Sequence, residues 1–239
     1  MSISSSISRF TTYLKRNGLR ATAGRVSLAV RRALFANRMA VFYCDIPAQK
    51  PSADLPSFLR VERHQKQGDL SSEDLQQITR VWNPKLAQRN LEERFRLGAS
   101  LWLIRFEDRL AGYGWTLQGR TVEPHYFSIG PDDEHLFDFH VFPAYRGRGI
   151  NPSLVNYILS TLAGESQGRA FIEAAEWNQA QLSSLSKTPF RRVGSARKLT
   201  FLGKTIVLWT RDSIAETVPK RETNSIVPHP EKRAVNSRV

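Results

Sequence analysis

Apolar side chains recur along this chain with two different periods, which together predict alternating strands and helices. Leu59 and Val61 alternate with charged residues, which is the period-two pattern of a half-buried strand. Leu75, Ile78 and Val81 recur at helical spacing instead. Along the chain the two patterns predict strands at 39–46, 57–64, 134–142 and 170–177, hairpins at 100–120 and 191–211, and helices at 70–82, 86–98, 151–164 and 178–187.

Short local signals mark several of these boundaries. Ser71 is followed three residues later by Asp74, a spacing typical of the capping box that begins a helix. Gly98 is expected to end the second helix, because glycine readily adopts the left-handed conformation found after a helix. The polar residues 107–109 predict the turn of the first hairpin.

Positive charge is concentrated near the N-terminus. The chain has 239 residues and a net charge of +13, yet residues 1–44 hold eight Lys or Arg and no acid, whereas residues 45–211 hold 22 basic and 18 acidic residues. Val26, Val30 and Leu34 predict an amphipathic basic helix over about residues 23–38. This helix either packs on the domain or attaches to an anionic membrane surface, and an acid-free N-terminus can also be a transit peptide.

The composition therefore predicts three parts: a basic arm over residues 1–40, a folded domain over 41–211 and a disordered tail over 212–239. No apolar run is long enough to span a membrane. One cysteine, Cys44, excludes an internal disulfide and a cysteine-built zinc site. We expect a cytoplasmic protein without a metal ion. Nucleic-acid binding is disfavoured, because the arm lacks the interleaved aromatic residues of single-strand binding proteins.

The stretch HVFPAYRGRGIN, residues 140–151, runs from an apolar strand through glycines into a helix. Glycines before a helix let a phosphate approach unpaired backbone amides at the positive end of the helix dipole. The Walker pattern is absent, and Pro152 stands where the Rossmann pattern needs its third glycine. The two glycines alone are equally typical of a strand-to-helix turn that binds no ligand. The surrounding sequence is therefore needed to tell the two kinds of turn apart.

Residues 141–151 resemble motif A of the GNAT acyltransferase superfamily, in which [Q/R]-x-x-G-x-[G/A] binds the pyrophosphate of coenzyme A. Arg146, Gly147 and Gly149 match it, whereas Asn151 departs from the usual Gly or Ala. The later segment 175–190 resembles the family's fifth strand and following helix, with Asn178, Lys187 and Phe190 in register. The resemblance covers about residues 57–211. It implies an α/β GNAT fold, with a mixed central sheet of about seven strands, helices on both faces and a splay between the fourth and fifth strands.

The same resemblance implies acetyl-CoA as the acyl donor. The main chain of Phe139, Val141 and Phe142 would hold the pantetheine arm and the acetyl carbonyl, and Asn178 would contact pantetheine or stabilise its turn. The pyrophosphate would lie on the turn formed by Arg146, Gly147, Arg148, Gly149, Ile150 and Asn151. The implied reaction is direct attack of an amine on the thioester, which needs a base and a proton for the departing thiolate.

Two residues are the leading candidates for the base. Asp138 and His140 lie two apart on one strand and so share a face, although both could instead be structural hydrogen-bonding groups. The family's common donor tyrosine is Leu185 here, and Phe137 stands where polyamine enzymes often have Glu. Weaker candidates are Ser184, Ser186, Glu173 and Glu176.

The sequence thus predicts an N-acetyltransferase for a small amine. An amino sugar or amino acid fits better than a polyamine, because the chain is basic and lacks part of the acidic pair. Trp115 and residues 123–127 would help to choose the acceptor or would pack in the core. The alternative is a non-catalytic GNAT-like module that binds CoA and docks on a membrane or nucleic acid through its basic arm. The oligomeric state is left open.

Overall fold

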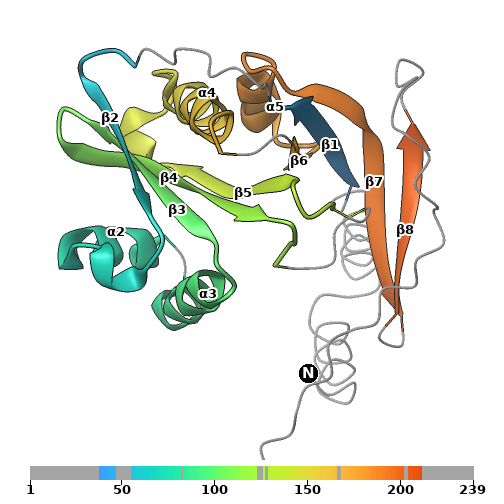
Figure 1. Cartoon of the computed structure of the whole chain (residues 1–239), viewed down its shortest axis with the longest axis horizontal. Coiled ribbons are helices and arrows are strands. Elements are labelled where there is room, and N and C mark those ends of the chain that lie inside the picture. The colour runs from blue at the N-terminus through green and yellow to red at the C-terminus, as the bar shows by residue number, and fades with distance from the viewer. Residues whose placement is uncertain are drawn as a thin grey trace, which may run out of the picture.

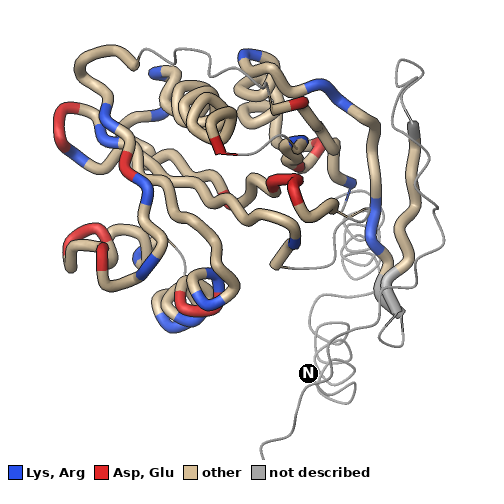
Figure 2. The backbone as a smooth tube through the Cα atoms, viewed as in Figure 1, with Lys and Arg blue, Asp and Glu red and all other residues tan. Residues whose placement is uncertain are grey.

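The computed structural model describes residues 38–46, 55–81, 83–122, 126, 129–165, 168–201 and 204–211. The predicted arm helix lies outside these residues except for Arg38, which begins a strand, and the predicted tail lies outside them entirely. Within the described ranges, every predicted strand and helix is present. Acidic and basic residues are interspersed along the backbone of this part (Figure 2).

The fold is built on one sheet of eight strands in the order β2-β3-β4-β5-β6-β1-β7-β8 (Figure 1). Their bounds are β1 Arg38–Asp45, β2 Leu59–His64, β3 Ser100–Phe106, β4 Arg109–Gln118, β5 Glu134–Val141, β6 Arg169–Ala175, β7 Arg191–Phe201 and β8 Lys204–Arg211. The family resemblance implied about seven strands, which are β2 to β8. The predicted strand at 39–46 is the eighth, β1, and it joins the sheet between β6 and β7, antiparallel to both. The sheet is mixed, since β5 and β6 are parallel.

Helices cover both faces of the sheet, as expected. In Figure 1, α2 (Ser72–Arg80) and α3 (Pro84–Arg96) lie on one face, and α4 (Ile150–Leu162) and α5 (Gln179–Leu185) lie on the other. Short 3-10 turns are η1 (Gln67–Asp69) and η2 (Pro143–Tyr145). Each face has its own apolar core: Leu154 and Ile158 of α4 pack with Trp102, whereas Ile78 and Leu91 of α2 and α3 belong to the core beneath Trp115.

Polar contacts fix the helices at their ends. The Ser71 hydroxyl accepts a hydrogen bond from the Asp74 amide at 3.0 Å, which confirms the predicted capping box. Asp74 is buried and binds both terminal nitrogens of Arg105 on β3, at 3.1 and 2.8 Å. Burial acts to raise the pKa of Asp74, but hydrogen bonds from Arg105 and Ser71 outweigh it and lower that pKa. This ion pair ties α2 to the sheet.

The predicted splay is present between β5 and β6, which are the fourth and fifth strands counted from β2. These strands pair only from Glu134 to Leu136, so the later part of β5 has β4 on one edge and an open edge on the other. Within this open part the strand bulges at Asp138, whose φ of 50° lies in the left-handed region. The bulge lies opposite Gly114 of β4, where an added Cβ would meet the Phe139 ring at 2.5 Å. Gly114 therefore leaves the space that the Phe139 ring fills.

Candidate active site

The turn after β5 presents bare backbone. Gly147 and Gly149 have φ of 78° and 74°, conformations that glycine adopts at little cost, and Gly149 is the N-cap of α4 without any side-chain cap. A Cβ added to either glycine would meet no atom within 4 Å. The helix N-terminus is thus open to an anion, which would interact with its unpaired amides and its dipole.

The side chains of this turn are turned away or engaged elsewhere. The Arg146 Nε donates to the Val141 carbonyl at 3.1 Å, and the Arg148 guanidinium lies 5.2 Å from the centre of the Phe106 ring. Ile150 is buried in the core beneath α4. Asn151 donates from Nδ2 to the Ser184 hydroxyl at 2.8 Å, which links α4 to α5. Any phosphate bound here would therefore meet mainly main-chain groups.

The open edge of β5 offers further main-chain groups. The Phe142 amide donates to Ala111 of β4 at 2.9 Å, and consecutive strand residues direct their polar groups to opposite edges. Phe139 and Val141 consequently direct theirs toward the splay, where the Val141 carbonyl already accepts from Arg146, whereas the amide of Phe142 faces β4. Asn178 caps α5: its side chain accepts from the Gln181 amide at 3.2 Å, which is the turn-stabilising alternative.

His140 lies on the α3 side of the sheet among aromatic rings. Its imidazole stacks on Tyr113 with 5.6 Å between centroids and meets Phe142 edge-on at 5.4 Å. Burial lowers the pKa of His140 below its ordinary 6.5, the charge of Arg146 lowers it further, and Asp138 opposes both. The imidazole is therefore mainly neutral at physiological pH, the form that can accept a proton.

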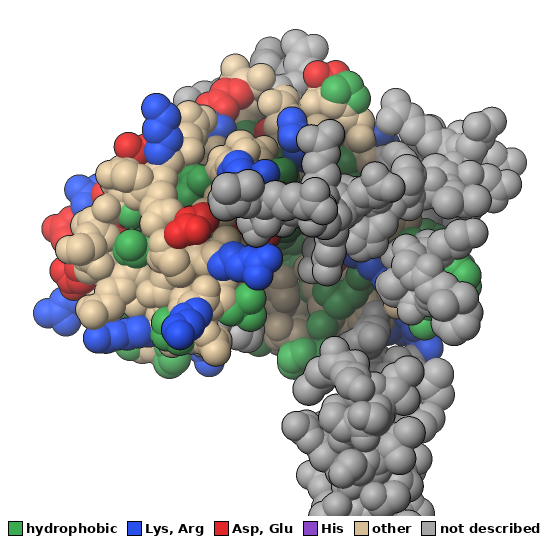
Figure 3. Space-filling model, turned by 90° about the horizontal axis from the view of Figure 1, so that it is seen from below, with side chains coloured by type: hydrophobic (Ala, Val, Ile, Leu, Met, Phe, Trp, Pro, Cys, Tyr) green, Lys and Arg blue, Asp and Glu red, His purple; other side chains and the backbone are tan. Residues whose placement is uncertain are grey.

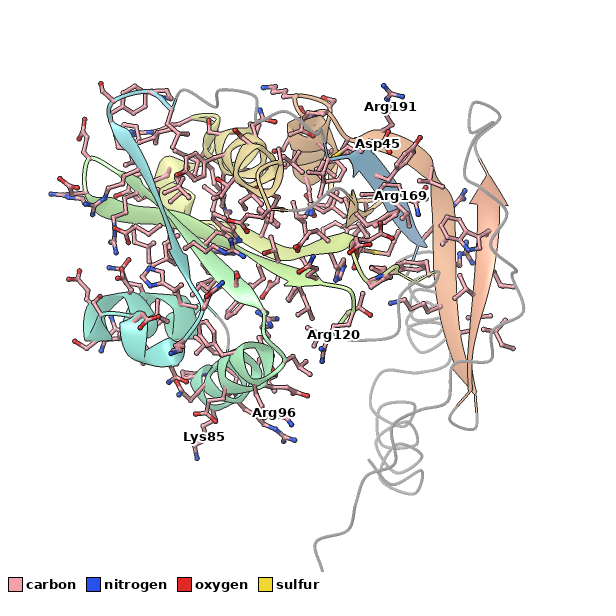
Figure 4. The ribbon with its side chains drawn as sticks, viewed as in Figure 1. Asp45, Lys85, Arg96, Arg120, Arg169 and Arg191 are labelled. Carbon is pink, nitrogen blue, oxygen red and sulfur yellow. The ribbon has the colours of Figure 1, made fainter. Side chains whose placement is uncertain are left out.

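Asp138 shares this face with His140, as the spacing predicted, but its carboxylate is already paired. Arg94 of α3 donates from Nη1 to Asp138 Oδ2 at 2.5 Å. The same guanidinium lies 5.1 Å from the Trp115 ring centre and 5.4 Å from that of Phe137. Other cations of α3 differ: Lys85 and Arg96 point away from the sheet (Figure 4). Sequence reasoning missed Arg94, because no local pattern links residues 44 positions apart.

The remaining candidates are either paired with other side chains or buried. Glu173 of β6 meets the Nε2 of His135 on β5 at 2.9 Å, on the α3 side beside the splay. Glu176 is instead held by Arg38 at 2.9 Å and Arg192 at 2.8 Å. Leu185, at the position of the family tyrosine, is fully buried in the α4-side core.

Two further candidates, Trp115 and Tyr126, are buried core residues. Trp115 is 1% exposed and is a core residue rather than a free surface for an acceptor. Of residues 123–127 only Tyr126 is described, and it packs edge-on against Trp209 of β8.

Figure 3 looks onto the face that carries α2 and α3, where apolar side chains gather beside basic ones.

Two other kinds of site concern metal ions and membranes. In the described ranges, no group of three or more His, Cys, Asp or Glu is arranged to hold a metal ion. None of the helices in those ranges combines the length and apolarity needed to cross a bilayer.

Comparison with known proteins gives a family match. Residues 68–184 match the model of the acetyltransferase (GNAT) family. The comparison with curated proteins returns no match.

Solved structures resemble the chain at low identity. A GNAT-family protein from Novosphingobium aromaticivorans is 14% identical with a TM-score of 0.44, over 66% of this chain and 64% of that one. The GCN5-related N-acetyltransferase from Kribbella flavida is 12% identical with a TM-score of 0.38, over 57% and 48%. The IAA acetyltransferase from Bacillus cereus is 14% identical with a TM-score of 0.39, over 54% and 74%. The chain thus spans less than two thirds of the first two proteins.

Proposed function

We propose that the chain, whose residues 68–184 match the model of the acetyltransferase (GNAT) family, is an acetyl-CoA-dependent N-acetyltransferase that acts on a small amine. The observation that carries this proposal is that main-chain groups are presented continuously from the open edge of β5, at Phe139 and the Val141 amide, into the glycine turn that begins α4. An elongated ligand with an anionic middle and an uncharged arm fits such a surface.

The cofactor would be held almost entirely by main chain. Its pyrophosphate would bind the amides from Gly147 to Asn151, and its pantetheine arm would extend the edge of β5 at Phe139 and Val141 in the manner of an added strand. The acetyl carbonyl would then lie next to the bulge at Asp138, where the strand's polar groups are freed from regular pairing.

His140 would supply the base. The amine nitrogen attacks the thioester carbon, a C–N bond forms, the C–S bond breaks and the nitrogen loses one proton. A neutral imidazole accepts that proton, directly or through water, and its pKa below 6.5 keeps it neutral at the pH of most cells. The departing thiolate can then take a proton from the imidazolium or from water, since Leu185 offers none.

Asp138 would act on the base and on the acceptor rather than as the base itself. Its negative charge raises the pKa of His140 and so keeps the imidazole basic enough to accept a proton. Its pair with Arg94 places a cation on the acceptor side, backed by the buried ring of Trp115 and by the ring of Phe137. An acceptor that carries a carboxylate or several hydroxyls, such as an amino acid or amino sugar, suits that surface better than a polyamine.

A second function is favoured by one residue. Leu185 fills the position of the family's donor tyrosine with a buried apolar side chain, which is compatible with a CoA-binding module that does not turn over. In that case residues 1–40, with their uncompensated positive charge, would dock the domain on an anionic membrane.

One assay separates the two functions. Thiol release from acetyl-CoA is followed with a panel of amino sugars, amino acids and polyamines, with an amine-free reaction as the hydrolysis control. The proposed enzyme releases thiol faster with at least one amine and forms the N-acetyl product. Binding of CoA without amine-dependent release by any amine class would favour the non-catalytic module.

A further inference from the structure

A pocket lies at the opposite end of β5 from the proposed cofactor turn. It has a volume of about 150 Å³ and opens between the end of β2 and the start of β5, on the face that carries α4. Glu134 begins β5 and Val141 ends it, so the pocket is roughly 23 Å from the turn at about 3.3 Å per strand residue. It is therefore separate from the site of the proposed reaction.

The floor of the pocket is polar and buried. It consists of Ser100, Thr116 and Glu134, which are 4%, 2% and 4% exposed. Register explains why they meet: Ser100 lies opposite Thr116, and Glu134 lies opposite Gln118 two residues further along β4. Three hydrophilic side chains on one face of a central sheet cost stability unless they have partners, because burial removes their water.

Most of these polar groups do have partners. The Ser100 hydroxyl accepts from Arg63 Nε at 3.0 Å, and the Thr116 hydroxyl accepts from Trp102 Nε1 at 3.0 Å. Arg63 also pairs with Glu165 at 2.6 Å, so these two charges form the wall of the pocket and cancel. The Arg63 guanidinium lies 4.9 Å from the centre of the Trp102 ring, and this contact helps to hold the guanidinium in place.

Glu134 is the exception. Its carboxyl group makes no hydrogen bond and no ion pair with any described residue, although it lines the pocket and is buried. Burial raises its pKa to about 7; Arg63 acts in the opposite direction and Glu165 adds to the rise. Since Arg63 and Glu165 neutralise each other, the pocket has one uncompensated negative charge once Glu134 is ionised.

We propose that this pocket binds the ammonium group of a small primary amine, with the Glu134 carboxylate as its counter-ion. An ammonium has three N–H donors, and the Glu134 oxygens, the Thr116 hydroxyl and the Gln118 side chain at the rim offer acceptors. A volume of 150 Å³ corresponds to about five water molecules in the liquid, so the ligand or the ligand's end has only a few non-hydrogen atoms. An anion would be repelled by the Glu134 carboxylate, because Arg63 and Glu165 cancel each other.

The test measures how methylammonium changes the thermal unfolding of the full chain, because a ligand that binds only the folded state raises the midpoint. Tetramethylammonium and potassium, at equal ionic strength, carry the same charge without N–H donors. The expected result is a saturable rise with methylammonium alone. An equal rise with potassium would overturn the ammonium assignment, and no rise with any cation would mean that the pocket holds water only.

Two variants locate the effect. Glu134→Gln keeps the shape but removes the charge and should weaken methylammonium binding about tenfold or more. Glu93→Gln removes one exposed charge on α3 and should leave binding unchanged. Equal binding by wild type and Glu134→Gln would overturn the proposal.

A measurement on the wild type covers the case in which Glu134→Gln fails to fold. Methylammonium binding should strengthen as the pH rises through about 7, where Glu134 ionises. Binding that stays constant through that range would also overturn the proposal.

Discussion

The cofactor turn and the face beneath α3 are built in opposite ways. The turn from Arg146 to Gly149 is exposed, contiguous in sequence and made of main chain, and no atom would obstruct a Cβ on either glycine. The α3-side face is made of side chains from several elements: Arg94 comes from α3, Trp115 from β4 and His140 from β5. The first region depends on backbone conformation, the second on the identity and mutual contacts of side chains.

This difference predicts separable effects. Side-chain substitutions on the α3-side face should change turnover and pH dependence and leave CoA affinity alone. Substitutions that alter the turn's backbone or fill its open space should do the reverse.

The largest effect is expected from His140→Ala. Without the imidazole, the amine must lose its proton to water, so we expect kcat to fall by about 10²- to 10⁴-fold. CoA affinity measured by calorimetry should not change. His64→Ala, on β2 away from the proposed site, is the matched control and should keep wild-type turnover. Wild-type kcat in His140→Ala would assign the base elsewhere.

Gly114→Ala should have an intermediate effect, on stability. Its Cβ would meet the Phe139 ring at 2.5 to 2.8 Å, so the ring or the bulge must move. Overpacking of this kind typically costs about 1–3 kcal/mol of unfolding free energy. Chemical denaturation measures it, with Gly68→Ala as control because no atom lies within 4 Å of that added Cβ. Equal stability of the two variants would mean that the bulge yields without cost.

The smallest effect is expected from Asp138→Asn, and it is a change of pH dependence. Asparagine tolerates the left-handed backbone at this position, so only the charge is lost. Asp138 raises the pKa of His140, so its removal should lower that pKa and move the acidic limb of the kcat/KM profile to lower pH. Asp108→Asn, also left-handed but in the exposed β3–β4 turn, should leave the profile unchanged. A limb that moves to higher pH would contradict the assignment of His140 as base.

The sequence predicts the cofactor turn better than it predicts the face beneath α3. The elements, the capping box at Ser71 and the splay after Leu136 follow from local periodicity, from short signals and from the family resemblance. The position of β1 does not, because its pairing joins Met39 to Ala175, and strand order is not written in either segment.

The same limit applies inside the proposed site. The glycine turn is a run of neighbouring residues and is visible as a motif. The Arg94–Asp138 and His135–Glu173 pairs join residues 44 and 38 positions apart. The bulge at Asp138 also depends on Gly114 of the neighbouring strand, which leaves space for the Phe139 ring. Such contacts arise from tertiary register, which a single sequence does not specify.

CoA binding by Gly149→Glu and Gly98→Glu tests the central claim most directly. Both glycines are left-handed, with φ of 74° and 85°, and neither has an atom within 4 Å of an added Cβ, so the two substitutions have similar backbone strain and the same charge. Only the first places a carboxylate at the N-terminus of α4. Calorimetry should show wild-type CoA affinity in Gly98→Glu and no detectable binding in Gly149→Glu. Wild-type affinity in Gly149→Glu would contradict the claim that this turn holds the cofactor.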